Sequence, residues 1–190
     1  MPKDAFAIVH EIALDHHGYF TMEQAREAGV APMAVVMMAR RGTIERIAHG
    51  LYLNSLAPSS PFGPYMAATL WPHGTRGVIS HQTALDLLGL SDANPDRIHI
   101  TLPKDMRIRR SVPRQYVLHH ANLPPSDTTL VEGIPVTTAA RTIRDCHAIR
   151  LGPALLRQAI DDGRRTGRLT AAQATGLERD VLSQVGDEAR

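Results

Sequence analysis

The feature that most constrains the fold is the stretch Leu-Ala-Pro-Ser-Ser-Pro-Phe-Gly-Pro at residues 56–64. Three prolines and two serines within nine residues are typical of a linker or a long turn, because proline supplies no backbone N–H to a helix or a sheet. A chain of 190 residues is long enough for two small domains. We therefore predict one domain over residues 1–57 and a second over residues 62–190.

The first part has the pattern of three helices followed by a hairpin. Apolar residues recur at helical spacing over about residues 3–16, and a capping-box sequence at residues 21–24 opens a short second helix. Pro32 suits the first position of a third helix, which ends at Gly42. Over residues 44–53 the apolar period changes to two, with a turn at His49-Gly50. This order predicts a winged helix-turn-helix, and a generic small α+β bundle is the alternative.

The second part mixes helices and strands. The patterns predict helices at about 62–70, 81–88, 138–146, 153–165 and 171–184, and extended segments at 78–80, 97–102, 115–119 and 134–137. Ser80 is read as the cap of its helix, and the segment that follows residue 102 as a loop or hairpin connection. The expected fold class is α+β, with a winged helix-turn-helix ahead of a small mixed α/β domain.

Three segments, in the same order along the chain, resemble the AbiEi abortive-infection antitoxin family. Residues 42–52, from Gly42 through Arg46 to Tyr52, resemble the wing of that family. Residues 79–90 resemble its helix that opens with Ser-His, and residues 133–145 resemble its Ile-Pro-Val-Thr stretch with a later Arg-Thr and Asp. The resemblance implies a two-domain regulator of a type IV toxin–antitoxin pair.

In such proteins the winged helix binds operator DNA upstream of its own operon, and an α/β antitoxin domain opposes a cognate nucleotidyltransferase-like toxin. We therefore expect an antitoxin and autorepressor that binds repeats in its own promoter. The alternative is a protein-binding antitoxin or adaptor whose winged helix does not read DNA. A monomer or weak dimer, cooperative on DNA, is the expected state.

Cations on the third helix and the hairpin are the expected DNA contacts of the first domain. Placing Val35 and Met38 inward leaves Arg40 and Arg41 outward, where they would meet phosphates. The other outward residues would be apolar: Met33, Ala34, Val36 and Met37. Direct base reading needs Arg, Lys, Asn or Gln, so the same strip also suits burial against a partner. On the hairpin, Arg46 and His49 are the candidate contacts, whereas Tyr52 is read as core packing.

The strongest basic excess lies in residues 104–114. Lys104, Arg107, Arg109, Arg110 and Arg114 face only Asp105 there, whereas residues 1–57 carry five Lys/Arg against six Asp/Glu. Five cations in eleven residues would neutralise several phosphates. A solvated loop or a patch for an acidic partner is an equally good interpretation.

No arrangement of residues in the sequence predicts catalysis, a metal or a cofactor. His16-His17 and His119-His120 are adjacent pairs that would not converge on one ion, and HExxH, paired CxxC and phosphate-loop signatures are missing. Arg141 and Asp145 have the spacing of an ion pair on a helix, worth about 0.3–0.5 kcal/mol if exposed. We expect a non-enzymatic protein without cofactor.

Composition gives the expected compartment. The single cysteine permits no internal disulfide, and the amino terminus lacks a basic start followed by an apolar run. The early apolar run at residues 34–39 is too short to span a membrane. We expect a cytoplasmic protein without a membrane partner.

Overall fold

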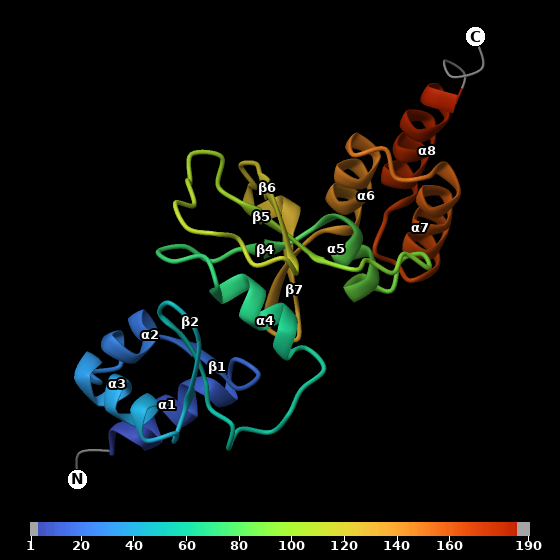
Figure 1. The fold of residues 1–190 in the computed structure, drawn as a ribbon. Coiled ribbons are helices and arrows are strands. Elements are labelled where there is room, and N and C mark those ends of the chain that lie inside the picture. Colours follow the sequence, from blue (N-terminus) through green and yellow to red (C-terminus); the bar gives the residue numbers. More distant parts are fainter. Residues whose placement is uncertain (1–3, 186–190) are drawn as a thin grey trace. The chain divides into compact units, whose positions relative to one another are not determined.

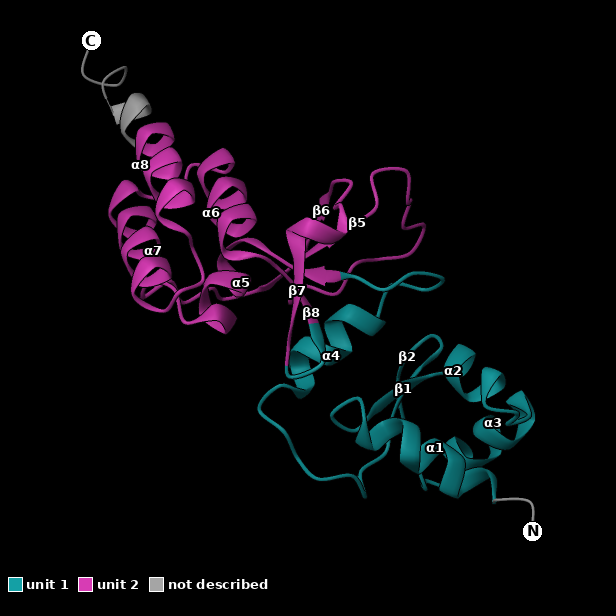
Figure 2. Cartoon of the chain, turned by 180° about the vertical axis from the view of Figure 1, so that it is seen from behind, with its two compact units in different colours: residues 1–77, 132–134 teal, residues 78–131, 135–190 magenta. Residues whose placement is uncertain are grey.

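The computed structural model describes residues 4–185, and the side chains of residues 4–181. It divides the chain into two compact units, shown in two colours in Figure 2. Unit 1 comprises residues 1–77 with 132–134, and unit 2 comprises residues 78–131 with 135–190. The linker predicts that residues 1–57 and residues 62–190 fold as separate domains, and this stays a prediction.

Unit 1 contains four helices and a small sheet among its described residues (Figure 1). In chain order these are α1 (Ala5–Leu14), β1 (Tyr19–Thr21), α2 (Met22–Glu27), α3 (Pro32–Arg40), β2 (Glu45–Ala48), β3 (Leu51–Leu53) and α4 (Gly63–Leu70). The sheet has the order β1-β3-β2, and β3 is antiparallel to both neighbours. The three helices and the hairpin follow the sequence pattern, whereas β1 was not predicted because three residues show no period.

The core of unit 1 lies between α1, α2, α3 and this sheet. Its fully buried members are Val9, Ala13, Phe20, Ala25, Val30, Val35, Ile44 and Tyr52. Phe20 of β1 is paired with Tyr52 of β3, and their rings stack with centroids 5.5 Å apart. The expectation that Tyr52 serves packing is confirmed, since it is 3% exposed.

Unit 2 combines a five-stranded sheet with four helices among its described residues (Figure 1). In chain order these elements are β4 (Val78–Ile79), α5 (His81–Leu88), β5 (Ile98–Leu102), β6 (Tyr116–His120), the 3₁₀ turn η1 (Pro125–Asp127), β7 (Thr128–Val131), β8 (Ile134–Thr137), α6 (Ala139–Ala148), α7 (Pro153–Arg165) and α8 (Ala171–Val185). The strand order is β6-β5-β4-β8-β7. Helix α5 packs on β5, and α6 packs on α5, α7 and α8.

Strand direction decides between the two predicted forms of the segment after residue 102, in favour of the loop. Strands β5 and β6 run parallel, with His99 beside Val117 and Thr101 beside His119. Residues 103–115 therefore cannot be a hairpin, because a hairpin joins antiparallel strands. The segment instead has to return over the five-residue length of the strands, about 16 Å at 3.3 Å per residue.

Among residues 4–185, no helix is both long enough and apolar enough to cross a lipid bilayer. The fold class is mixed α and β, with small antiparallel pairing in unit 1 and a mixed sheet in unit 2.

Candidate functional site

Two consecutive helices of unit 1 present the first candidate surface. Thr21 accepts a hydrogen bond from the backbone N–H of Gln24, and Gln24 Oε1 accepts one from the N–H of Thr21, which is the predicted capping box. After a short turn, α3 begins at Pro32, where the missing N–H costs no helical hydrogen bond. Local chemistry thus fixes where α2 and α3 begin.

The cations predicted on α3 are exposed. Arg40 is the last residue of α3, and Arg41 follows as its C-cap. Val35 is buried and Met38 packs on the core, as the spacing predicted. Ala34 also packs on the core, so its predicted outward position is wrong.

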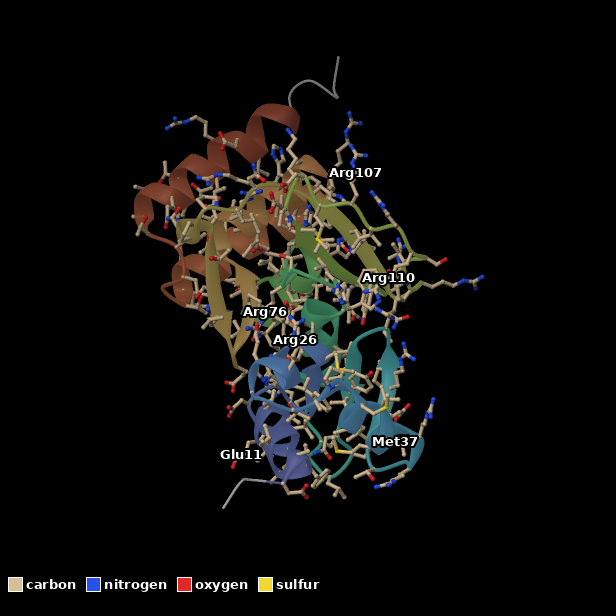
Figure 3. All side chains as sticks on the ribbon, turned by 90° about the vertical axis from the view of Figure 1, so that its left-hand side faces the viewer. Glu11, Arg26, Met37, Arg76, Arg107 and Arg110 are labelled. Atoms are coloured by element: carbon tan, nitrogen blue, oxygen red, sulfur yellow. The ribbon has the colours of Figure 1, made fainter. Side chains whose placement is uncertain are left out.

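The outer surface of α3 is apolar around its middle. Met33 is 67% exposed, and Val36 and Met37 are half-buried. Figure 3 labels Met37 on this helix. These side chains offer no bidentate hydrogen bonds to base edges.

The β2–β3 hairpin brings two predicted residues together. Arg46 Nη2 lies 3.4 Å from His49 Nδ1, and Arg46 Nε donates to the carbonyl of Ala48 at 3.4 Å. The register of β2 against β3 shifts between Arg46 and Ala48, so the pairing is irregular next to the turn. Both side chains are exposed, so the hairpin presents a cation and an imidazole near its turn.

The other predicted cations belong to unit 2. Lys104, Arg107, Arg109 and Arg114 are exposed on the segment that joins β5 and β6. Arg110 is half-buried, and this burial lowers the pKa of its guanidinium. Figure 3 labels Arg107 and Arg110 on this loop. The predicted residues thus form two sets, one in each unit.

Unit 2 also holds a histidine cluster that the sequence did not reveal. His81 starts α5, His99 lies in β5 and His119 lies in β6. One ring nitrogen from each lies within 4.8 Å of those of the other two. His99 Nδ1 and His119 Nε2 are 3.0 Å apart, and the His81 ring stacks on the His119 ring with centroids 3.5 Å apart.

The parallel register explains why these rings meet. Thr101 is paired with His119, so His99, two residues earlier on the same face, is the diagonal neighbour of His119. A sequence signal was present, because Ser80-His81 precedes a strand that alternates as Ile-His-Ile-Thr. The parallel direction of β6 was the missing information.

Burial keeps the cluster uncharged. Burial, and after it the neighbouring imidazoles, lower the pKa of His81 to about 3 and that of His119 to about 4. The pKa of His99 is also lowered, mainly by burial. The three rings are therefore neutral near pH 7, each with one nitrogen lone pair.

Ser80 does not cap α5 as predicted. It occupies the N-cap position, but in the described structure its hydroxyl makes no capping hydrogen bond. Ser80 Oγ instead accepts a hydrogen bond from Thr101 Oγ1 at 2.8 Å and lies 2.9 Å from His81 Nδ1. The serine belongs to the histidine cluster.

Arg141 is the centre of a second polar cluster in unit 2, formed with Asp127 and Asp145. Arg141 Nε donates to Asp145 Oδ1 and its Nη1 donates to Asp127 Oδ2, each at 2.8 Å. The predicted pair with Asp145 is therefore confirmed. It is far less exposed than expected, since the side chains of Arg141 and Asp145 are only 18% and 15% exposed.

Two family models match successive parts of the chain. Residues 8–55 match the family model described as a transcriptional regulator, AbiEi antitoxin. Residues 77–150 match the model of the AbiEi antitoxin C-terminal domain.

Among solved structures, the RV2827C protein from Mycobacterium tuberculosis has a similar fold. The TM-score is 0.54 at 17% sequence identity, with 91% of this chain and 70% of that chain covered. At this identity the likeness concerns the fold alone. Among curated proteins none matches the chain. With both of its matched domains assigned to AbiEi antitoxins, the chain belongs to the AbiEi antitoxin family of transcriptional regulators.

Proposed function

We propose that this chain is an antitoxin that represses its own toxin–antitoxin operon and opposes a nucleotidyltransferase-like toxin. Unit 1 would act as a winged helix-turn-helix that binds operator DNA. The observation that carries this proposal is the element order α1-β1-α2-α3-β2-β3 with the sheet order β1-β3-β2. A tightly joined helix pair followed along the chain by a two-stranded hairpin is the order expected of a helix-turn-helix with a wing, which supports the proposal.

In this proposal α3 enters the major groove and the hairpin contacts the DNA backbone. Arg40 and Arg41 end α3 and are exposed, so they would contact phosphates at the edge of the groove. Arg46 and His49 would do the same from the hairpin. Exposed Met33 would contact thymine methyl groups rather than form hydrogen bonds with bases.

The loop at residues 103–115 would add affinity without sequence preference. Residues 1–57 carry one more acid than base, which does not favour approach to a polyanion. Exposed Lys104, Arg107, Arg109 and Arg114 supply the compensating charge. Contacts from this loop to phosphates would make binding depend on salt.

A second candidate is an antitoxin or adaptor that uses α3 to bind protein. The favouring observation is the apolar outer surface of α3, with Met33 67% exposed. A protein partner would bury that surface, and the opposition to the toxin would proceed without DNA.

A gel-shift titration with the chain's own promoter separates the two candidates. We expect the promoter to bind at least about tenfold more tightly than shuffled DNA, since specific sites usually exceed random ones by about 10³ or more. The double variant Arg40→Ala/Arg41→Ala should lose binding. The variant Arg168→Ala removes an exposed arginine from unit 2 and is the matched control. Equal affinity for promoter and shuffled DNA would exclude the repressor function.

Co-expression with the adjacent toxin tests the division of labour. We expect Arg40→Ala/Arg41→Ala to rescue growth as well as the unchanged chain, because toxin opposition is assigned to the second part. Loss of rescue by a folded double variant would contradict this division and favour the adaptor candidate.

A further inference from the structure

The histidine cluster of unit 2 has the composition of a metal site. We propose that His81, His99 and His119 bind one divalent transition-metal ion of the zinc class, with a fourth coordination position left for water or a small anion. Three neutral imidazoles favour Zn²⁺, Co²⁺, Ni²⁺ or Cu²⁺ over Mg²⁺ and Ca²⁺, which prefer oxygen ligands.

Two of the nitrogens are already close to ligand geometry. A tetrahedral zinc ion with Zn–N of about 2.0–2.1 Å holds its nitrogens roughly 3.3 Å apart and its ring centroids roughly 5 Å apart. His99 Nδ1 and His119 Nε2 are 3.0 Å apart, and their ring centroids are 5.1 Å apart. One of these two nitrogens carries the proton of their hydrogen bond, so metal binding would require that proton to move to the other nitrogen of the same ring.

The third ring needs one adjustment. The centroids of His81 and His99 are 5.8 Å apart, near the ligated value, whereas those of His81 and His119 are 3.5 Å apart. Binding would replace the stacked contact by ligation, and the His119 ring would swing away by about 1.5 Å. His119 is the least buried of the three residues and lies on edge strand β6, so this motion disturbs no further strand.

A hydrogen bond to Ser80 occupies one ring nitrogen of His81. Ser80 Oγ has two acceptor lone pairs, and Thr101 Oγ1 donates to one of them. His81 Nδ1 lies 2.9 Å from the same Ser80 Oγ and is engaged in a hydrogen bond with it. Nε2 is therefore the His81 nitrogen left to bind a metal. Hydrogen bonds of this kind fix the ring and tautomer of metal-ligating histidines.

The backbone at His81 is strained, which also supports a functional role for this residue. Its φ is +54°, a left-handed conformation that a non-glycine residue rarely adopts. The conformation is held at the first position of α5, next to the turn from β4. Strain of this kind is concentrated at functional sites, and here it accompanies a polar ring that is only 6% exposed.

Charges around the cluster permit a cation. Arg141 acts on His81, but Asp127 and Asp145 both pair with its guanidinium. Arg97 and Asp96 act on His99 with opposite signs. Each arginine near the cluster is thus balanced by at least one aspartate, and neither group adds a net positive charge beside the three rings.

Cobalt titration of the full chain tests the site. After treatment with a chelator, we expect saturation at one Co²⁺ per chain, with the visible absorption of a tetrahedral ion, and displacement by Zn²⁺. His81→Asn and His119→Ala should weaken binding by more than about tenfold, equivalent to about 1.4 kcal/mol. Asparagine is chosen at residue 81 because it tolerates positive φ. His120→Ala is the matched control, since His120 is exposed and adjacent on the same strand.

A ligand-exchange variant excludes a purely structural effect. In His119→Cys a thiolate replaces the imidazole, and cobalt binding should produce a sulfur-to-metal charge-transfer band that only a direct ligand gives. Far-UV circular dichroism checks that each variant is folded. The proposal is overturned if the unchanged chain binds no Co²⁺ or Zn²⁺, if His120→Ala weakens binding as much as His119→Ala, or if cobalt-loaded His119→Cys lacks the band.

Discussion

The Arg141 network gives a prediction whose magnitude follows from its burial. Replacing Arg141 by Met keeps the aliphatic stem and removes two hydrogen bonds to carboxylates, each 2.8 Å long. Hydrogen bonds to charged groups contribute about 1.5–3 kcal/mol each. Arg141, Asp145 and Asp127 are 18%, 15% and 26% exposed, so solvent compensates in part. We expect Arg141→Met to lower the free energy of unfolding by about 2–3 kcal/mol, below the 3–5 kcal/mol of a fully buried pair.

Replacing the carboxylate partner Asp145 should lower the free energy of unfolding much less than replacing Arg141. Burial raises the pKa of this carboxyl, and the hydrogen bond from Arg141 opposes that shift. Its Oδ2 atom is buried and finds no hydrogen-bond partner among the described residues. Asp145→Asn removes a poorly solvated charge and keeps an acceptor for Arg141 Nε, so we expect a change within about 1 kcal/mol.

Urea unfolding followed by circular dichroism near pH 7.5 measures both changes. The matched control is Arg165→Met, which breaks an ion pair with Asp162 in which Arg165 is 72% exposed, and it should cost under about 0.5 kcal/mol. The reasoning is refuted if Arg141→Met costs no more than Arg165→Met, or if Asp145→Asn costs as much as Arg141→Met.

Acid should reduce the cost of Arg141→Met. Without the guanidinium, the pKa of Asp145 rises further above its value in the unfolded chain. The folded variant then binds a proton more tightly than the unfolded one, so its stability increases as the pH falls through the folded pKa. The difference in unfolding free energy between Arg141→Met and the unchanged chain should therefore be smaller near pH 4.5 than near pH 7.5.

Three further expectations concern the loop, the helix packing and the thiol. The triple variant Arg107→Ala/Arg109→Ala/Arg110→Ala should weaken binding to promoter and random DNA alike, and it should flatten the slope of log affinity against log salt by roughly 0.9 for each phosphate that is no longer neutralised. An unchanged slope with failed toxin opposition would instead assign the loop to a protein partner. Gly163→Ala should lower the free energy of unfolding by about 1–3 kcal/mol. The Cβ of the alanine would lie 2.7 Å from Leu169 Cδ1 and 2.8 Å from Leu169 Cγ. Gly176→Ala, with nothing within 4 Å, should stabilise by about 0.5–1 kcal/mol in the same urea assay. Cys146 is fully buried and its pKa is raised to about 12, so a thiol reagent such as dithionitrobenzoate should react only at the rate of unfolding. Rapid labelling of the native chain would contradict that burial.

The sequence predicted those parts of the fold that depend on neighbours along the chain. The capping box predicted at residues 21–24 forms, because Thr21 and Gln24 are only three residues apart. Thr170 and Gln173 have the same spacing and form the same pair of hydrogen bonds. Helices α5 and α7 begin and end where the pattern places them. Strands β1 and β7 were missed, since three or four residues give too little period to recognise.

The histidine cluster shows where prediction from sequence ended. Its rings come from one helix and two strands, and they meet only because β5 and β6 run parallel. Adjacent histidines in the sequence drew attention to His119-His120, but successive strand residues face opposite sides. Only His119 joins the cluster, and His120 is exposed.

The parallel pairing of β5 and β6 also determines how this protein can change over generations. Because β5 and β6 are parallel, the loop between them must connect the end of β5 to the start of β6. This requirement fixes the minimum length of the loop and not its sequence. Four of the five cations on that loop are exposed, so selection could reverse or remove them without disturbing a buried contact. The fold thereby contains a segment whose length is set by topology and whose charge is open to adaptation toward a new toxin or a new operator.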